Sequence, residues 1–395
     1  MTDAAQAKRN ILLLAISQAL YSCCVITVFS TGSLVGLMLA PNAGLATLPI
    51  TAFVAGSALT TIPASLTMQH IGRIPVFMTG ATASICGAAL AVFAIYTRNF
   101  AMFCAACALQ GVFQSTSGFY RFAAVEGALP EMKPLAISWV LTGGVVAGIA
   151  GTLIASGTSE LLAPFTFAGS YLAVAVIGAI ALVVLTLLRL PKPSPEEIHG
   201  VSRPWSELLQ QPKLIVAMAC ATLSYGMMNL MMTAAPVAMV GCGFHQMDAS
   251  WVIQWHVLAM FVPSFFTGHL IKKYGAEKIA GIGMLLLITA GVTGLAGITF
   301  GHFAVALILL GLGWNFGFIG GTTMLTASYN PAERGKVQGA NDFIMSTVVA
   351  IASFSSGKIL AVAGWNFVNI ALFPMALLAL ALIAWQTLKR QQVKV

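Results

Sequence analysis

Charged residues are scarce in this chain of 395 residues: Asp, Glu, Lys and Arg together make up 8% of it, whereas 58% of the residues are hydrophobic. A soluble domain carries about 25% charged residues. The scarcity excludes an ordinary soluble protein and predicts a polytopic protein of the lipid bilayer. Apolar runs of roughly 20 residues, separated by Gly, Pro and charge clusters, predict spanning helices rather than the strands of a barrel.

Other absences narrow the function further. The seven Cys are an odd number and lie mostly within apolar runs, so no disulfide framework is expected. The sequence has no ATP-binding loop, nucleophile elbow or zinc-protease motif, and we therefore expect neither an enzyme nor a prosthetic group. The net charge of +8 comes from Lys and Arg at helix ends, where the positive-inside rule places them, so no nucleic-acid partner is expected.

Twelve spanning helices are predicted from the apolar runs. They cover 11–39, 45–67, 76–96, 100–122, 135–157, 164–189, 213–240, 250–271, 277–298, 302–326, 338–360 and 366–387. The first follows Lys8 and Arg9 and is too long for a cleavable signal peptide. The longest polar segment predicts a division into a six-helix half at 1–190, a cytoplasmic linker at 191–212 and a second six-helix half at 213–395.

The distribution of Lys and Arg predicts the orientation. With the N-terminus in the cytoplasm, almost every basic residue of the loops lies on the cytoplasmic side, and the opposite side keeps only Arg98 and Lys358. Basic loops stay in the cytoplasm during insertion. Both termini are therefore expected to be cytoplasmic.

Landmarks of the first half recur in the second at nearly constant spacing, which indicates an internal duplication. The recurring pairs are Gly72 and Gly275, Gly111 and Gly313, and Glu131 and Glu333. Two six-helix halves of the same orientation resemble the Major Facilitator Superfamily. The resemblance implies an all-α polytopic membrane protein with twelve transmembrane helices in two six-helix halves.

The loop after the second span departs from the pattern of that family. The family usually has an Asp where this chain has Gln69, followed by the basic residue that stands here as Arg73. Asp342 is a candidate partner for Arg73 at this gate, or else an acid favoured by the dipole at the start of a helix. Arg121 and Glu126 are expected to form a structural ion pair rather than a substrate clamp.

Methionine and histidine recur with helical spacing in the seventh and eighth spans. Met228 and Met232 share one helix face, and so do His256 and Met260. A rise of about 1.5 Å per residue places all four at similar depth in the outer half of the membrane. Thioether and imidazole ligands suit Cu(I), and an ionisable residue in a span indicates function. The alternative is ordinary core packing, because Met fills gaps in apolar helices.

Further soft ligands lie close to these four. Met227 and Met231 form a second pair, rotated by about 100° around the helix. Cys242, His245 and Met247 lie in the link between the two spans, where they are candidates to collect a soft metal or are loop residues without a role.

Two prolines accompany the motif. Pro236 and Pro263 each remove one helical hydrogen bond and free a carbonyl one turn earlier, at Met232 and Ala259. Broken helices beside a binding site recur in transporters, although proline is also common in membrane helices generally.

The segments 250–268 and 333–343 resemble the CcoA-like copper importers, a branch of the Major Facilitator Superfamily. The resemblance implies an inner-membrane protein of bacteria that imports copper for a haem–copper oxidase of the cbb3 type. It also implies cytoplasmic copper chaperones or oxidase-assembly factors as partners. The metal-binding residues of the branch carry over as Met228, Met232, His256 and Met260.

The leading hypothesis is therefore import of Cu(I), as transported substrate, by alternating access. Because the same branch includes relatives linked to riboflavin uptake, import of an organic solute such as riboflavin is the alternative. Aromatic side chains would then stack on the ligand, the candidates being Phe113, Tyr120, Trp251, Trp255 and Trp314. A membrane metal sensor or assembly factor is a third possibility, disfavoured because the sequence has no long soluble domain.

Overall fold

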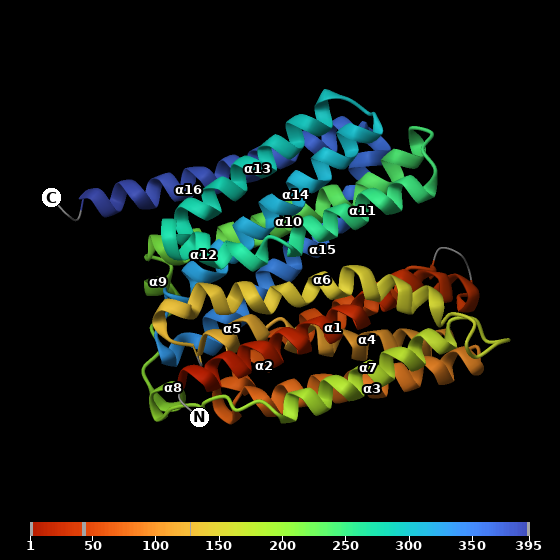
Figure 1. Ribbon diagram of the computed structural model, residues 1–395, viewed down its shortest axis with the longest axis horizontal. Coiled ribbons are helices and arrows are strands. Elements are labelled where there is room, and N and C mark those ends of the chain that lie inside the picture. Colours follow the sequence, from red (N-terminus) through yellow and green to blue (C-terminus); the bar gives the residue numbers. More distant parts are fainter. Residues whose placement is uncertain (1–2, 42–44, 127, 393–395) are drawn as a thin grey trace. The chain divides into compact units, whose positions relative to one another are not determined.

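The computed structural model describes residues 3–41, 45–126 and 128–392. Within these ranges the chain forms helices and no strand (Figure 1). It divides into two compact units. Unit 1 consists of Met1–Pro130, Trp139–Gly200 and Arg334–Phe343, and unit 2 of Glu131–Ser138, Val201–Glu333 and Ile344–Val395. The division into halves at 190 and 212 stays a prediction. The outer ends of the two predicted halves, residues 1–2 and 393–395, lie outside the described ranges.

Most helices belong to one unit alone. Those of unit 1 are α1 (Asp3–Leu39), α2 (Leu48–Ile71), α3 (Arg73–Tyr96), α4 (Phe100–Ser117), α5 (Tyr120–Glu126), α7 (Ala168–Thr186) and α8 (Pro195–His199). Those of unit 2 are α9 (Trp205–Leu208), α10 (Pro212–Gly241), α11 (Gln246–Phe261), α12 (Ser264–Tyr274), α13 (Ala276–Ala296), α14 (Phe300–Thr326) and α16 (Leu372–Gln392). Helices α6 (Lys133–Gly157) and α15 (Arg334–Ile370) each contribute residues to both units.

The twelve predicted spans all correspond to helices. Ten stretches of the described chain are long and apolar enough to cross a membrane. One of them, Pro331–Lys389, contains the last two predicted spans, which Gly364 separates with a φ of 78°. The fourth span is divided between α4 and α5, and the eighth between α11 and α12. The all-helical fold expected from the sequence is confirmed.

The duplication is visible in the backbone. Gly72 ends α2 and Gly275 ends α12, both with a φ of 90° and both donating an N–H bond to the carbonyl four residues earlier. A positive φ is readily adopted only by Gly, which explains why this landmark recurs. The short 3₁₀ helices η2 (Pro130–Met132) and η3 (Pro331–Glu333) likewise precede α6 and α15.

The core of unit 1 is apolar and aromatic. Phe53 of α2, Phe103 of α4 and Tyr171 of α7 are fully buried and belong to one cluster. Phe103 and Tyr171 meet edge to face with ring centroids 5.3 Å apart, an arrangement that aromatic pairs prefer. The spanning helices of unit 1 therefore pack against each other mainly through apolar and aromatic side chains, which need few hydrogen-bond partners.

The polar segment between the halves is anchored in each unit. Glu197 of α8 accepts hydrogen bonds of 2.9 and 3.1 Å from Arg334 in unit 1. Arg203 donates bonds of 2.5 and 2.7 Å to Glu333 in unit 2, and this hydrogen bonding raises the pKa of the Arg203 guanidinium. The linker predicted from composition thus contains two short helices, and ion pairs join it to Arg334 and to Glu333.

Candidate functional site

The methionines predicted as metal ligands are mostly core residues of α10. Met227, Met228 and Met231 are buried and Met232 is half-buried. On α11, which contacts α10, Met260 is also buried. Buried thioethers on adjacent faces of one helix fill space between neighbours, as Met commonly does. Neither of the two methionine pairs stands out by burial as the one that faces a site.

His256 is held by α14. Its side chain is 0% exposed, and its Nδ1 lies 2.7 Å from the carbonyl oxygen of Leu307. The helices approach closely here, because a Cβ on Gly311 would come within 2.7 Å of the His256 carbonyl. Among the described residues, no three His, Cys, Asp or Glu side chains gather where they could hold a metal. A metal at His256 would therefore need ligands of other kinds, such as thioethers.

Two of the three secondary candidates near the turn between α10 and α11 cap helices. Cys242, His245 and Met247 are exposed. Cys242 is the C-terminal cap of α10, and His245 is the N-terminal cap of α11, where its backbone N–H donates to the Asp248 carboxylate at 3.0 Å. A cap of this kind satisfies backbone groups that a helix end leaves unpaired. Capping accounts for the polar residues of this turn.

The two prolines differ in effect. Pro236 lies inside α10, which continues to Gly241, whereas Pro263 separates α11 from α12. At this break Asn315 of α14 donates from Nδ2 to the Met260 carbonyl at 2.6 Å. That carbonyl is one residue beyond Ala259, where the sequence predicts the freed group.

Asn315 also ties the second part of the broken helix. Its Nδ2 lies 2.7 Å from Ser264 Oγ, and its Oδ1 accepts a bond of 2.6 Å from Thr267. A buried amide with both ends engaged fixes the position of its neighbours. Sequence reasoning missed Asn315, although a lone Asn within an apolar span was a signal.

An aromatic cluster lies on α10, α11 and α14 in unit 2. Trp314 and Phe318 stack with ring centroids 5.0 Å apart and planes at 10°. Tyr225 meets Trp314 at 5.4 Å and Phe318 at 5.6 Å, both edge to face. Phe261 meets Trp314 at 5.6 Å. The sequence predicted Trp314 as a stacking residue and missed the other three.

The remaining predicted aromatics are divided between the two units. Trp251 and Trp255 are 52% and 54% exposed on α11. Phe113 belongs to unit 1, where it packs edge to face on Tyr21 at 5.4 Å. Tyr120, also in unit 1, packs on Phe77 at 4.8 Å. Within unit 2, the ring contacts of Trp314 described above involve neither Trp251 nor Trp255.

The ion pairs of unit 1 differ from the pairing predicted at the gate. Arg73 does not pair with Asp342; its Nε lies 2.7 Å from both carboxylate oxygens of Glu126. Asp342 instead accepts a bond of 2.5 Å from Arg121. Both pairs are buried, and a buried ion is stable only with a partner. Glu126 is the last residue of α5. The loop pattern in the sequence did not predict that α5 would lie beside the start of α3.

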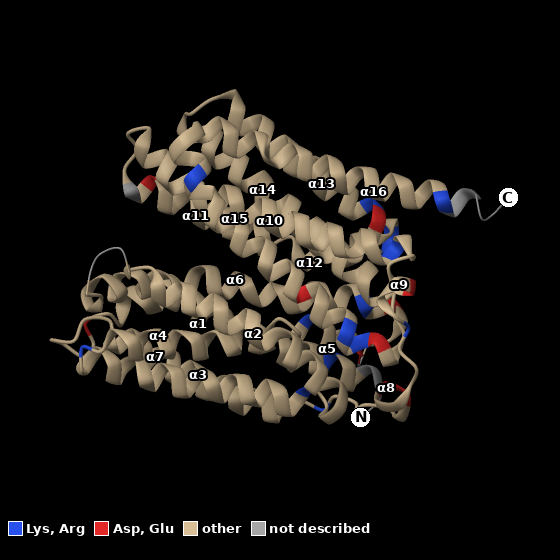
Figure 2. Ribbon diagram, turned by 180° about the vertical axis from the view of Figure 1, so that it is seen from behind, with Lys and Arg blue, Asp and Glu red and all other residues tan. Residues whose placement is uncertain are grey.

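Linker and helix residues extend this network. Arg334 lies 3.3 Å from Glu126 as well as 2.9 Å from Glu197. Gln69, at the position where the family usually has Asp, donates at 2.7 Å to the backbone carbonyl of Glu197. Figure 2 shows Lys and Arg together with Asp and Glu near α5 and α8. The loop has no Asp, and the carboxylates of this network come from Glu126 of α5 and Glu197 of α8.

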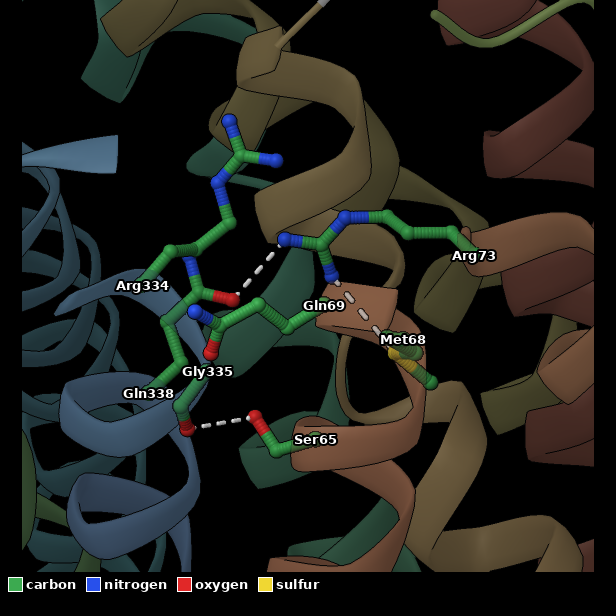
Figure 3. Close-up of a pocket in the computed structure, with 7 residues that line it drawn as sticks. All are labelled: Ser65, Met68, Gln69, Arg73, Arg334, Gly335 and Gln338. Atoms are coloured by element: carbon green, nitrogen blue, oxygen red, sulfur yellow. Dashed lines mark hydrogen bonds between the residues drawn. The ribbon is translucent and has the colours of Figure 1, made fainter. Parts of the chain in front are cut away.

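A small pocket within unit 1 adjoins this network (Figure 3). It is lined by Ser65, Met68, Gln69, Arg73, Arg334, Gly335 and Gln338. Arg73 donates to Gln338 at 2.9 Å and to the Met68 sulfur at 3.7 Å. Ser65 donates to the Gly335 carbonyl at 2.8 Å. The polar lining is engaged in internal bonds, so the pocket is part of the ion network rather than a site for a solute.

The sequence matches the Major Facilitator Superfamily over residues 14–250 and 214–394. The chain belongs to this superfamily and is a multi-pass membrane protein. It is 46% identical over 382 residues to the riboflavin transporter RfnT of Brucella anthropi, and the match covers 96% of each chain. It is 24% identical to the uncharacterized transporter YddS of Bacillus subtilis, over 90% of this chain and 86% of that one.

Solved structures support the fold. The transporter FucP in its outward conformation aligns with a TM-score of 0.74 at 15% identity, covering 94% of this chain and 98% of FucP. A bacterial homologue of the iron transporter ferroportin aligns with a TM-score of 0.71 at 14% identity, over 96% and 99% of the two chains. Identities this low establish the shared architecture alone.

The prediction of copper import is wrong. A relative sharing 46% of its residues over 96% of both chains is a riboflavin transporter, and no comparison supports the copper-importing branch. The predicted partners that depended on copper, a chaperone or oxidase-assembly factors, lose their basis. The motif does not by itself specify a metal, because Met at helical spacing is also an ordinary way to pack an apolar helix, and Met227, Met228 and Met231 of α10 are buried.

Proposed function

We propose that this chain is a riboflavin transporter of the bacterial inner membrane that carries riboflavin into the cytoplasm by alternating access. The observation that carries the proposal is the 46% identity to the riboflavin transporter of Brucella anthropi across 96% of both chains. Identity spread over nearly the whole length extends to the helices that would line a substrate path, beyond what shared fold alone provides.

The chemistry of unit 2 is compatible with such a substrate. Riboflavin is uncharged at neutral pH and consists of a flat fused-ring system with a polyhydroxylated chain. The cluster around Trp314 and Phe318 offers aromatic surface for stacking. The buried charges of unit 1 are committed to Arg73–Glu126 and Arg121–Asp342, and an uncharged solute does not need them as ligands.

Uptake of labelled riboflavin tests the proposal. The chain is expressed in bacteria that neither synthesise nor import riboflavin, and cells with empty vector serve as the control. Expected results are saturable uptake that unlabelled riboflavin competes away, and growth on low external riboflavin. Cellular copper should equal that of the control. Uptake at the vector level, with the protein present in the membrane, would overturn the proposal.

A further inference from the structure

Two helix faces of unit 2 meet along a line of aromatic and polar side chains. On α10 the line consists of Thr222, Tyr225 and Asn229, each about one turn from the next. On α14 it consists of Trp314, Phe318 and Thr322 at the same kind of spacing. Helices α10 and α14 contact each other and run side by side in Figure 1. Together the six residues form one face, the α10–α14 face.

Contacts fix the register of this face. The Tyr225 ring meets both Trp314 and Phe318. A Cβ on Gly321 would come within 2.7 Å of the Ala221 nitrogen, so the backbones nearly touch there. Thr222 and Thr322 directly follow these two contact residues and therefore lie at a similar level. Along α10 the aromatic contact at Tyr225 thus has a hydroxyl on one side and the Asn229 amide on the other.

Four polar atoms of the α10–α14 face are buried without a hydrogen-bond partner among the described residues: Thr222 Oγ1, Asn229 Oδ1, Trp314 Nε1 and Thr322 Oγ1. Burying such groups unpaired costs free energy, and native proteins rarely do it. Trp314 and Thr322 are 2% and 0% exposed. Four such atoms on one face, beside stacked rings, indicate a ligand that supplies the missing partners.

Other threonine hydroxyls of α10 and α14 do have hydrogen-bond partners. Threonines in membrane helices usually bond to a carbonyl of the preceding turn. Thr323, next to Thr322, does so with Ile319 at 2.8 Å, and Thr233 of α10 does so with Asn229 at 2.7 Å. Thr222 and Thr322 depart from the rule on the face that carries Tyr225 and the two stacked rings.

We propose that the α10–α14 face is the surface that binds the flavin ring; this rests on the proposed function. The ring stacks against Tyr225, Trp314 and Phe318. One ring carbonyl accepts from Trp314 Nε1 and the neighbouring imide N–H donates to Asn229 Oδ1, while the polyhydroxylated chain accepts from the threonine hydroxyls at the other end of the face. Thr222 and Asn229 are separated by about 10 Å along the helix axis, comparable to the length of three fused rings. Tyr225 and Asn229 are half-buried, which gives a ligand access to the face.

Replacement of one hydroxyl by a methyl group tests the proposal. In T322V the shape is kept and no internal bond is lost, because the hydroxyl has no partner among the described residues. In the matched control T323V a methyl group replaces a hydroxyl that bonds to Ile319. T222V serves as a second probe if T322V folds poorly. Binding is measured on the purified full-length protein by quenching of riboflavin fluorescence, and uptake is measured in cells.

We expect T322V to raise the riboflavin Kd about 5- to 20-fold, the effect of one lost hydrogen bond to a buried group, with thermal stability unchanged or higher. T323V should bind riboflavin like the wild type. If the wild type binds riboflavin and both T322V and T222V bind it equally well, the assignment of the face is overturned while the proposed function stands. A wild type that neither binds nor transports riboflavin overturns the proposed function and the assignment with it.

Discussion

Asn315 reaches across from α14 to the carbonyl of Met260, the penultimate residue of α11, at 2.6 Å. The break that Pro263 introduces into the eighth span is thereby a defined joint, held on its other side through Ser264 and Thr267. A polar side chain thus bonds a backbone carbonyl beside the break that proline introduces.

Replacing Asn315 by Leu is expected to destabilise the protein by about 2–4 kcal/mol, because several buried polar groups lose their partner at once. The measurement is thermal or denaturant unfolding of the purified protein. Thr289→Val on α13 is the control: its exposed hydroxyl bonds within its own helix, to Leu285 at 2.9 Å, and its loss should cost less than about 0.5 kcal/mol. Equal stability of the two variants would contradict the role of Asn315.

Replacing Glu126 by Gln should cost about 3–5 kcal/mol, since Arg73 and Arg334 lose a buried carboxylate. The matched control is Glu131→Gln. Glu131 forms an exposed pair with Lys272 at 3.3 Å, and such pairs contribute about 0–1 kcal/mol. Unfolding in mild detergent compares the two. A small effect at Glu126, equal to that at Glu131, would refute the buried network.

Double-mutant cycles distinguish the observed ion pairs from the predicted one. Arg73 should couple strongly to Glu126, and Arg121 to Asp342, by about 1–3 kcal/mol each. The cycle between Arg73 and Asp342 should give a clearly smaller coupling energy. A larger coupling for Arg73 with Asp342 than with Glu126 would restore the pairing predicted from the sequence.

Removing copper should leave transport unchanged. Because riboflavin needs no metal ligand, a membrane-impermeant Cu(I) chelator is expected to have no effect on labelled riboflavin uptake, and Met260→Leu, which conserves volume, should reduce it less than about twofold. Accumulation of copper above the vector control would speak for the discarded function.

Fragments of riboflavin should differ as competitors. If the α10–α14 face recognises the ring, lumiflavin, which keeps the ring and lacks the polyhydroxylated chain, should compete for uptake, whereas ribitol should not. The readout is inhibition of labelled riboflavin uptake over a range of competitor concentrations. Competition by ribitol but not by lumiflavin would place recognition on the chain.

The sequence was sufficient to locate helices at all twelve predicted spans, because the length and apolarity of a span are set by the bilayer. It did not reveal the division of the fourth span at Gly118 and Phe119, or that Glu126 rather than Asp342 reaches Arg73. Those outcomes depend on where helices pack.

The candidate site was harder to predict for a chemical reason. His256 and the methionines are residue types that suit both a metal and an apolar core, and only contacts such as that of His256 with Leu307 show how they are used. Phe318 and Tyr225 are ordinary residues in sequence and become notable only through Trp314, which both contact.

Gly72 and Gly275 share a φ of 90° although little else in their loops agrees. A Cβ at Gly275 would meet nothing within 4 Å, and one at Gly72 only Pro193 at 3.4 Å. Both positions are therefore restricted to glycine by their positive φ and not by lack of space. A D-amino acid introduced by chemical ligation would suit either glycine, while its mirror image would strain the turn. The internal duplication is therefore visible in the left-handed backbone conformation that the two glycines share, which a comparison of side chains would not detect.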